Sequence, residues 1–417
     1  MTAAFFINSC CRYVRRGKMG ENMNYINPDF EKYFGQKPEY LFSAPGRTEL
    51  SGNHTDHQHG CVLAAAINLE MLAWVRTNDT DIIRVMSEGY PLSIIDLNDT
   101  DMKEEEKNTT NSLIRGIAAK FMEMGCEVKG FDAYVTSTVL PGSGLSSSAA
   151  FEVLIGTVIN HLYYGGKATP VEVAQIGQWA ENVYFGKPCG LMDQTASAVG
   201  SVISIDFADN SNPAVEKIDL DLTASGYALC IIDSGADHAD LTDEYAAITV
   251  ELKNVCRFFG KEYLREVDED EFYSNIAEVR RAAGDRAVLR AIHVFAENKR
   301  VQLQKEALKS NDFDAFLKHV KDSGLSSWRY LQNVTPAGYT AHQEVAFALA
   351  LAEKLLSGTK GVCRVHGGGF AGTIQAFVPL EVLTEFKSGM EKVLGKDRCH
   401  VLSVRSEGGV LIKQGEF

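Results

Sequence analysis

Residues 131–162 read FDAYVTSTVLPGSGLSSSAAFEVLIGTVINHL, and three patterns follow one another in this stretch. The first ten residues alternate as a strand does, and residues 141–150 are rich in Gly and Ser. Apolar side chains then recur at helical spacing. They are Phe151, Leu154, Ile155, Val158, Ile159 and Leu162. We therefore expect a strand at 131–140, a glycine-rich turn at 141–150 and a helix from about residue 151.

The turn at 141–150 has the features of an anion-binding site. Its glycines let the backbone approach a ligand closely, and the free N–H groups and the dipole at the start of a helix favour negative charge. The lysine of G-x-x-x-x-G-K-[ST] is absent, so this is not the usual P-loop. One of the three serines can cap the helix while another ligates a magnesium ion carried by a nucleotide. The alternative is a turn that merely caps the helix.

The surrounding segments predict both sheet and helix. Residues 61–76 are apolar with β-branched side chains, and residues 81–97 alternate and break at Gly and Pro as paired strands do. The acidic run 98–111 predicts a solvated loop before a helix at 112–125. From about residue 226 a second half begins with a buried strand, continues in long helices and ends in strands around 361–378.

Composition limits the classes of function. The 417 residues are 45% hydrophobic, enough for a sizeable core and for two or three domains. A net charge of -14 argues against a general nucleic-acid or anionic-membrane binder. Nine cysteines without a disulfide pattern, and no apolar run long enough to span a membrane, predict a cytoplasmic protein. The opening twenty or so residues predict a loosely ordered extension.

Residues 51–60, SGNHTDHQHG, raise the question of a metal site. Three histidines and Asp56 are competent zinc ligands. Their spacing matches neither His-Glu-x-x-His nor a Cys/His finger. The competing interpretations are a polar turn between two strands and a catalytic or binding segment.

Two further segments contain candidate functional residues. Residues 180–200 place Glu181 on a helical pattern and Asp193 in an apolar context, where a buried carboxylate needs a partner. Arg47 is the candidate partner. Residues 366–373, HGGGFAGT, are a second glycine-rich turn between apolar strands, which alone is weak evidence for a site.

Together these blocks resemble the GHMP small-molecule kinases and, within them, the galactokinases. APGRTELSGNHTDHQHG is similar to the galactokinase signature Gly-Arg-x-Asn-x-x-Gly-Glu-His-Thr-Asp, and PGSGLSSSAA to the phosphate loop. CGLMDQ is similar to the segment of the catalytic aspartate, and HGGGFAGT to the third motif. The order and spacing fit from about residue 30 to 380.

The resemblance implies an α+β, two-domain GHMP kinase fold. Residues 24–222 would form a domain like domain 2 of ribosomal protein S5, and residues 223–417 a ferredoxin-like domain. The implied reaction is phosphorylation of the anomeric C1 hydroxyl of a hexose by ATP with Mg²⁺, with galactose as the expected sugar. We expect a monomer that binds its sugar and ATP, with no nucleic acid or membrane partner.

The resemblance also assigns roles to residues. Asp193 would accept the proton of the C1 hydroxyl, and Arg47 would keep that carboxylate ionised and stabilise charge on the transferred group. Ser148 and Glu181 would be the magnesium ligands. The expected sugar contacts are Arg47, Asn53, His54, Asp56, Gly190, Asp193 and Tyr245. The expected nucleotide contacts are Gly142, Ser143, Gly144, Leu145, Ser146, Ser147 and Ser148.

The sequence departs from the family pattern in several places. Thr48 and Glu49 replace a small residue and an asparagine, and Asn53 replaces the glutamate of Gly-Glu-His. His57 replaces a tyrosine, and His366 with Ala371 alters the third motif. An asparagine at 53 would lift the repulsion that a glutamate exerts on a C6 carboxylate. Galacturonate therefore stays open as the alternative substrate. A sugar- and ATP-binding sensor without activity is the alternative of another class, and a kinase of a non-sugar alcohol is disfavoured by His-Thr-Asp.

Overall fold

The computed structural model describes residues 28–139, 144–236, 241–370, 372–415 and 417. In this part of the chain the strands form a large and a small sheet. The opening extension, the expected nucleotide contacts Gly142 and Ser143, and the altered position Ala371 lie outside the described residues.

The expected strand, turn and helix are confirmed, with shifted ends. The strand is β5 (Phe131–Ser137), and the helix is α3 (Ser147–Tyr163). The helix begins four residues earlier than the apolar pattern, because the small residues before Phe151 already form its first turn. Ser146 precedes it in the left-handed conformation, at φ 54°.

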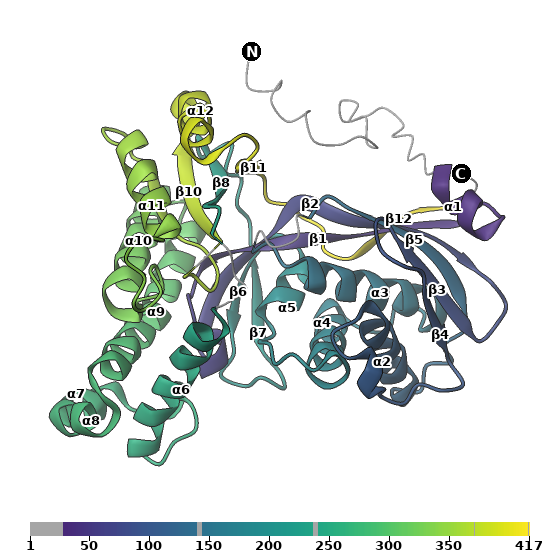
Figure 1. Cartoon of the computed structure of the whole chain (residues 1–417), viewed down its shortest axis with the longest axis horizontal. Coiled ribbons are helices and arrows are strands. Elements are labelled where there is room, and N and C mark those ends of the chain that lie inside the picture. Colours follow the sequence, from purple (N-terminus) through teal and green to yellow (C-terminus); the bar gives the residue numbers. More distant parts are fainter. Residues whose placement is uncertain (1–27, 140–143, 237–240, 371, 416) are drawn as a thin grey trace.

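The large sheet has the strand order β12-β1-β2-β5-β3-β4, with β6 pairing with β2 and β7. Its other strands are β1 (Tyr40–Ser51), β2 (Cys61–Thr77), β3 (Ile82–Ser87), β4 (Ser93–Asp96), β6 (Val202–Asp206), β7 (Ala214–Ile218) and β12 (Val410–Gln414). Figure 1 shows α2–α5 on one face of this sheet. These helices are α2 (Thr110–Glu123), α3, α4 (Pro170–Ala180) and α5 (Met192–Val199). Buried apolar side chains of the sheet and of these helices share one core.

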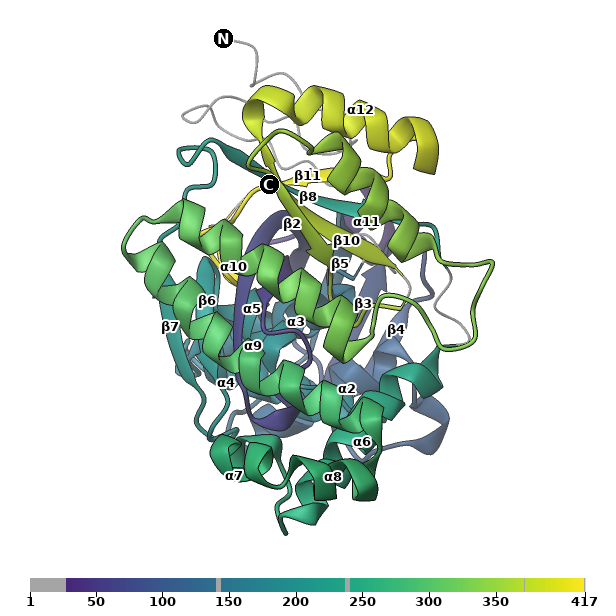
Figure 2. The ribbon, with the colours of Figure 1, turned by 90° about the vertical axis from the view of Figure 1, so that its left-hand side faces the viewer.

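The small sheet is antiparallel, in the order β11-β8-β10-β9. Its strands are β8 (Tyr227–Asp233), β9 (Val362–Val365), β10 (Thr373–Pro379) and β11 (Cys399–Leu402). Its core is completed by α11 (Glu344–Leu355) and α12 (Leu383–Leu394). Figure 2 shows both helices beside this sheet, with α9 and α10 crossing below it.

The remaining helices are mostly in the second half of the chain. They are α1 (Pro28–Phe34), α6 (Thr242–Phe258), α7 (Glu269–Ser274), α8 (Ile276–Ala283), α9 (Asp285–Lys309) and α10 (Phe313–Ser326). Short helical turns are η2 (Asp56–Gln58), η3 (Glu104–Glu106), η4 (Glu181–Phe185), η5 (Leu264–Glu266), η6 (Ser327–Leu331) and η7 (Leu380–Val382). The α6–α9 helices share a separate apolar cluster.

The α+β class is therefore confirmed, while the division into two domains stays a prediction. The expected boundary at 222/223 falls between β7 and β8, which belong to different sheets. The chain end departs from that simple division, because β12 returns to pair with β1 in the large sheet. The expected loop at 98–111 contains η3, and α2 begins within it at Thr110.

Two observations concern the cysteines and the membrane. The seven cysteines within the described ranges are all free. The described helices include none that is both long and apolar enough to cross a membrane.

Candidate active site

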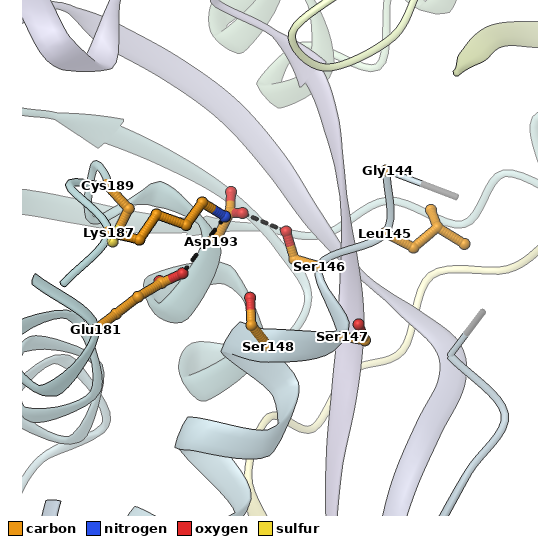
Figure 3. Close-up of a pocket in the computed structure, with 9 residues that line it drawn as sticks. All are labelled: Gly144, Leu145, Ser146, Ser147, Ser148, Glu181, Lys187, Cys189 and Asp193. Carbon is orange, nitrogen blue, oxygen red and sulfur yellow. Dashed lines mark hydrogen bonds and ion pairs between the residues drawn. The ribbon is translucent and has the colours of Figure 1, made fainter. Parts of the chain in front are cut away.

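A polar pocket lies at the N-terminus of α3. Figure 3 shows the residues that line it, which come from the glycine-rich turn, from η4 and the loop after it, and from the start of α5. They are Gly144, Leu145, Ser146, Ser147, Ser148, Glu181, Lys187, Cys189 and Asp193. The pocket volume is about 220 Å³, below the ~300–1,000 Å³ of sites that enclose a whole drug-sized ligand. The pocket therefore matches a part of a nucleotide, such as its phosphates.

The turn before α3 brings backbone donors to this pocket. Gly144 (φ 71°) and Ser146 are both in the left-handed region, and α3 begins at Ser147. No side chain caps the helix among the described residues. The first N–H groups of a helix have no partner within it, so they are available to an anion.

Strand β1 delivers Arg47 to the other side of this turn. The pairing of β1 with β2 shifts register between Pro45 and Arg47, and such bulges redirect side chains. The Arg47 backbone N–H donates to the carbonyl of Leu145 at 3.2 Å. A Cβ on Gly46 would lie 3.0 Å from the same carbonyl oxygen, so the close approach of strand and turn favours glycine there.

Arg47 and Asp193 form a bidentate pair. Arg47 Nε donates to Asp193 Oδ1 and Arg47 Nη2 to Asp193 Oδ2, both at 2.6 Å, while Nη1 donates to the carbonyl of Gly144 at 2.5 Å. Ser146 Oγ also donates to Asp193 Oδ2. Burial alone would raise the pKa of Asp193, but the Arg47 charge and these hydrogen bonds lower it below its usual value. Asp193 is thus held ionised, with 31% of its side chain exposed to the pocket.

The two expected magnesium ligands line the same pocket. Glu181, at the start of η4, is 3% exposed, and Ser148 is in the first turn of α3. Gln194 Nε2 donates to Glu181 Oε2 and to Glu152 Oε2, both at 2.9 Å. Burial and the nearby Glu181 raise the pKa of Glu152 well above its ordinary value. Burial thus favours the neutral form of Glu152, and Glu181 is the carboxyl group that lines the pocket.

Three of the expected sugar contacts meet the second glycine-rich turn. Asn53 Nδ2 donates to the carbonyl of Gly367 at 2.5 Å, and Tyr245 Oη donates to that of Gly369 at 2.8 Å. His54 Nε2 lies 2.9 Å from the carbonyl oxygen of Gly368. Three consecutive carbonyls therefore position three side chains. Two of these side chains belong to the histidine-rich segment 51–60, so the turn at 366–373 holds that segment in place.

The histidines of residues 51–60 are hydrogen-bonding groups. His54 Nε2 must carry a proton because its partner is a carbonyl, so its Nδ1 accepts from His57 Nε2 at 3.2 Å. Burial lowers the pKa of His54 to about 3 and that of His57 to about 4, which keeps both neutral. His59 stacks on Tyr263. No group of three or more metal-ligating side chains occurs in the described ranges.

Asp56 and Gly190 are in contact. A Cβ on Gly190 would lie 2.2 Å from Asp56 Oδ2, so a side chain at 190 would displace the carboxylate. Burial raises the pKa of Asp56, and the charge of Asp193 adds to the rise. The structure thus brings Asp56, Gly190 and Asp193 into one region.

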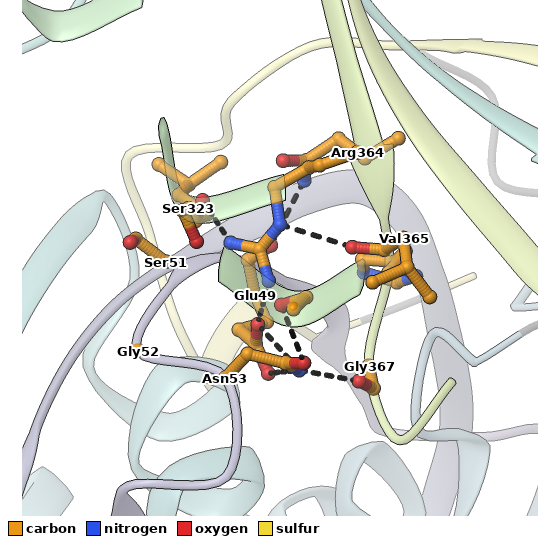
Figure 4. Close-up of polar contacts among 12 residues, drawn as sticks. Glu49, Ser51, Gly52, Asn53, Ser323, Arg364, Val365 and Gly367 are labelled. Carbon is orange, nitrogen blue, oxygen red and sulfur yellow. Dashed lines mark hydrogen bonds and ion pairs between the residues drawn. The ribbon is translucent and has the colours of Figure 1, made fainter. Parts of the chain in front are cut away.

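Asn53 makes its hydrogen bonds within the protein. It is fully buried, and its amide also donates to Glu49 Oε1 at 3.2 Å (Figure 4). Its Oδ1 accepts from Asn333 Nδ2 at 2.7 Å. Glu49 in turn pairs with the buried Arg364 at 2.7 Å. In the family pattern, position 49 is an asparagine and position 53 a glutamate. In this chain the acid is at 49 and the amide at 53, and the two side chains are in contact. Asn53 therefore presents no free amide to a ligand.

Sequence reasoning missed several polar residues of this region. Arg364 gave no signal, because a lone arginine on a strand is usually exposed. Thr48 and His366 were noted only as departures, yet Thr48 Oγ1 and His366 Nε2 are 3.0 Å apart. Lys187 lies six residues before Asp193 and lines the pocket. The absence of a P-loop lysine was a usable signal, because a phosphate-binding site without that lysine needs a positive charge from another residue.

Comparisons with known proteins agree with this geometry. Residues 28–77 match the galactokinase galactose-binding signature, and residues 112–201 match the GHMP kinases N terminal domain. A galactokinase of Glaesserella parasuis is 34% identical over 365 residues, covering 84% of this chain and 88% of the relative. One of Clostridium tetani is 30% identical over 382 residues, covering 90% and 94%. The crystal structure of Lactococcus lactis galactokinase complexed with galactose matches with a TM-score of 0.77 at 25% identity, covering 92% of this chain and 97% of that one.

The fold and the pocket together define an ATP-using kinase of the GHMP class. Within that class, the chain belongs to the galactokinase family.

Proposed function

We propose that the protein transfers the γ-phosphoryl group of ATP to the C1 hydroxyl of galactose. The observation that carries this proposal is the ionised Asp193, held by Arg47 in a pocket whose opposite wall is the N-terminus of α3. A carboxylate base and an anion site in one pocket are what transfer from a nucleotide to a hydroxyl requires. The galactokinase relatives and the galactose-bound neighbour support galactose as the sugar.

In this proposal Asp193 takes the proton of the sugar hydroxyl. Two carboxylate oxygens offer about four lone-pair sites. Arg47 occupies one on each oxygen and Ser146 a second one on Oδ2, which leaves one site on Oδ1. That site can accept the C1 hydroxyl. Transfer of this type depends mainly on positioning and electrostatics, so the base supplies only part of the acceleration.

Arg47 holds the base, and the helix start holds the phosphates. All three guanidinium nitrogens of Arg47 already have acceptors, which fixes the orientation of the Asp193 carboxylate. The N–H groups at the start of α3, together with those of the turn from Gly144 to Ser148, would bind the nucleotide phosphates. Gly142 and Ser143 are proposed to extend the same loop.

The residues also fit a magnesium ion. Mg²⁺ prefers oxygen ligands and binds through one or two carboxylates together with substrate phosphates. Glu181 and Ser148 offer a carboxylate and a hydroxyl at the phosphate loop, and Gln194 orients the carboxylate. When bound, the ion would neutralise charge on the β- and γ-phosphates. This fit supports Mg²⁺ as the cofactor.

Galactose is favoured over galacturonate by the Glu49–Asn53 contact. Asn53 left galacturonate open as the alternative substrate, but its amide donates to Glu49 and Gly367, and the Glu49 carboxyl group lies beside it. The proposed sugar contacts are His54, Asp56, Gly190 and Tyr245, with Asn53 positioning the segment from within. Monomeric state and cytoplasmic location stay predictions.

A test of the proposed function measures ADP release with free sugars. Purified protein with MgATP should turn over galactose at least tenfold faster than galacturonate, glucose or mannose, a margin of about 1.4 kcal/mol in transition-state binding. A sensor would bind galactose and ATP but release no ADP. ADP release with none of these sugars but with another alcohol would move the protein to a different GHMP kinase branch.

A further inference from the structure

Lys187 is the one basic residue among the described residues that line the phosphate pocket. Its backbone is firmly held, because the N–H groups of Gly186 and Lys187 both donate to the carbonyl of Glu181, at 3.0 and 3.1 Å. Gly186, at φ 85°, makes the sharp end of η4 that turns the chain here. The side chain then extends across the pocket toward Glu181 and Asp193 (Figure 3). The fixed backbone and the long side chain therefore place a positive charge on the side of the pocket formed by the loop after η4.

The ammonium group of Lys187 has spare hydrogen-bonding capacity. Its nearest carboxylate oxygen is Glu181 Oε1 at 3.6 Å, an ion pair longer than a normal hydrogen bond, and 64% of the side chain is exposed. A lysine ammonium carries three donors on a flexible stem. Within the part of the chain that the structure describes, Lys187 makes no hydrogen bond through that group. It can therefore bind a ligand without breaking a strong contact.

The acidic residues of the pocket make a positive charge such as that of Lys187 favourable for phosphate binding. Glu181 and Asp193 both line it, so their two negative charges oppose the binding of an anionic phosphate chain. Arg47 offsets the charge of Asp193 through their ion pair, and three of its five N–H donors are used by Asp193 and Gly144, so the Glu181 charge remains at this wall. The phosphate loop itself has no P-loop lysine.

We propose that Lys187 is a catalytic residue that binds the γ-phosphoryl group of ATP from the wall opposite α3. This proposal rests on the proposed kinase function. As the bond from phosphorus to the β-phosphate oxygen breaks and the bond to the sugar oxygen forms, Asp193 takes the proton and ADP leaves. Lys187 stabilises the negative charge on the transferred group throughout, and Glu181 positions it beforehand.

The test compares triphosphate and diphosphate binding in Lys187→Met, which keeps an unbranched stem of nearly the same length and removes the ammonium group. We expect the affinity for a non-hydrolysable ATP analogue, measured by calorimetry with Mg²⁺, to fall about tenfold or more, the loss expected of a hydrogen bond between charged groups. The affinity for ADP should change less than about threefold. The kcat should fall about a hundredfold, as for other single donors to transition-state charge. Lys187→Arg should recover much of both losses.

Lys107→Met is the matched control. The Lys107 side chain packs beside Gly186, where a Cβ would lie 3.6 Å from its Cδ, but it pairs with Glu104 and does not line the pocket. This variant should match the wild type in all three measurements.

Two outcomes would overturn the proposal. Equal losses for the analogue and ADP would place Lys187 away from the γ-phosphate. A changed Mg²⁺ requirement with an unchanged ratio of the two affinities would make it only a partner of Glu181. Failure of the wild type itself to bind either nucleotide would instead reject the proposed function.

Discussion

Arg47 and Asp193 are 146 positions apart in the sequence and are joined by two hydrogen bonds of 2.6 Å. This pair connects the start of α5 to the bulged part of β1, and Arg47 also reaches the phosphate loop through Gly144. The same contacts orient the base and set its charge. The catalytic carboxylate and the anion site are therefore built as one unit.

Replacement of Asp193 by asparagine tests the base. Asp193→Asn should lower kcat by about two to four orders of magnitude, the usual contribution of a positioned base, and leave ADP affinity nearly unchanged. Steady-state kinetics and calorimetry measure the two effects. Asp132→Asn is the control, because Asp132 forms a similar bidentate pair with Arg84 that is remote from the pocket. Retention of a tenth of the activity in Asp193→Asn would remove Asp193 from this role.

Arg47 should not be replaceable by lysine. Lysine cannot form the planar two-bond contact with Asp193, so the carboxylate would lose its fixed orientation. Arg47→Lys should lower kcat about tenfold or more and change KM for galactose less. Arg84→Lys, at the matched bidentate pair away from the pocket, should leave both constants unchanged. An unaltered kcat in Arg47→Lys would make Arg47 a structural partner.

Glu181 is tested by the magnesium requirement. Glu181→Gln keeps the shape and loses the charge that holds a hard cation, so the Mg²⁺ concentration for half-maximal activity should rise about tenfold. Glu152→Gln is the matched control, because Glu152 shares the Gln194 amide but does not line the pocket. Its Mg²⁺ titration should follow the wild type. A Glu181→Gln titration that also follows the wild type would reject Glu181 as a ligand.

The exchange of Glu49 and Asn53 predicts a double-mutant effect. Asn53→Glu alone would place two carboxylates in contact, and at about 4 Å these repel by roughly 4 kcal/mol at an effective dielectric near 20. We therefore expect Asn53→Glu to lower stability and galactose turnover. Glu49→Asn should also destabilise the protein, because it leaves the buried Arg364 unpaired.

The double variant shows whether the loss of stability comes from the Glu49–Asn53 contact or from each position separately. Glu49→Asn with Asn53→Glu restores one acid and one amide, so the double variant should lose about 2 kcal/mol less free energy of unfolding than the sum of the two single losses. Urea unfolding of the four proteins measures this coupling. Additive effects would show that the two side chains do not depend on each other.

Local patterns predicted much of the fold and of the site. Alternation and helical spacing located β5 and α3, and the glycine-rich turn between them indicated the anion site. The apolar context of Asp193 indicated a buried partner, and Arg47 is that partner. The strand, the turn, the helix and the need of Asp193 for a partner were accessible because each depends on a few neighbouring residues.

Contacts between distant segments were not predictable in the same way. Nothing local indicates that Asn53, His54 and Tyr245 meet three consecutive carbonyls of residues 367–369, or that Arg364 pairs with Glu49. The return of β12 to the large sheet is also non-local. The role expected for Asn53 depended on its exposure, which only the packing of both halves determines.

The most direct test of the central claim is the product formed from galactose and ATP. Phosphorus NMR of a reaction with MgATP and galactose should show ADP and one sugar phosphate, whose phosphorus couples to the anomeric proton of galactose. Asp193→Asn should give no such signal over the same time. A phosphate on any other carbon, or ATP hydrolysis to free phosphate with galactose unchanged, would contradict the assignment of a galactose 1-kinase.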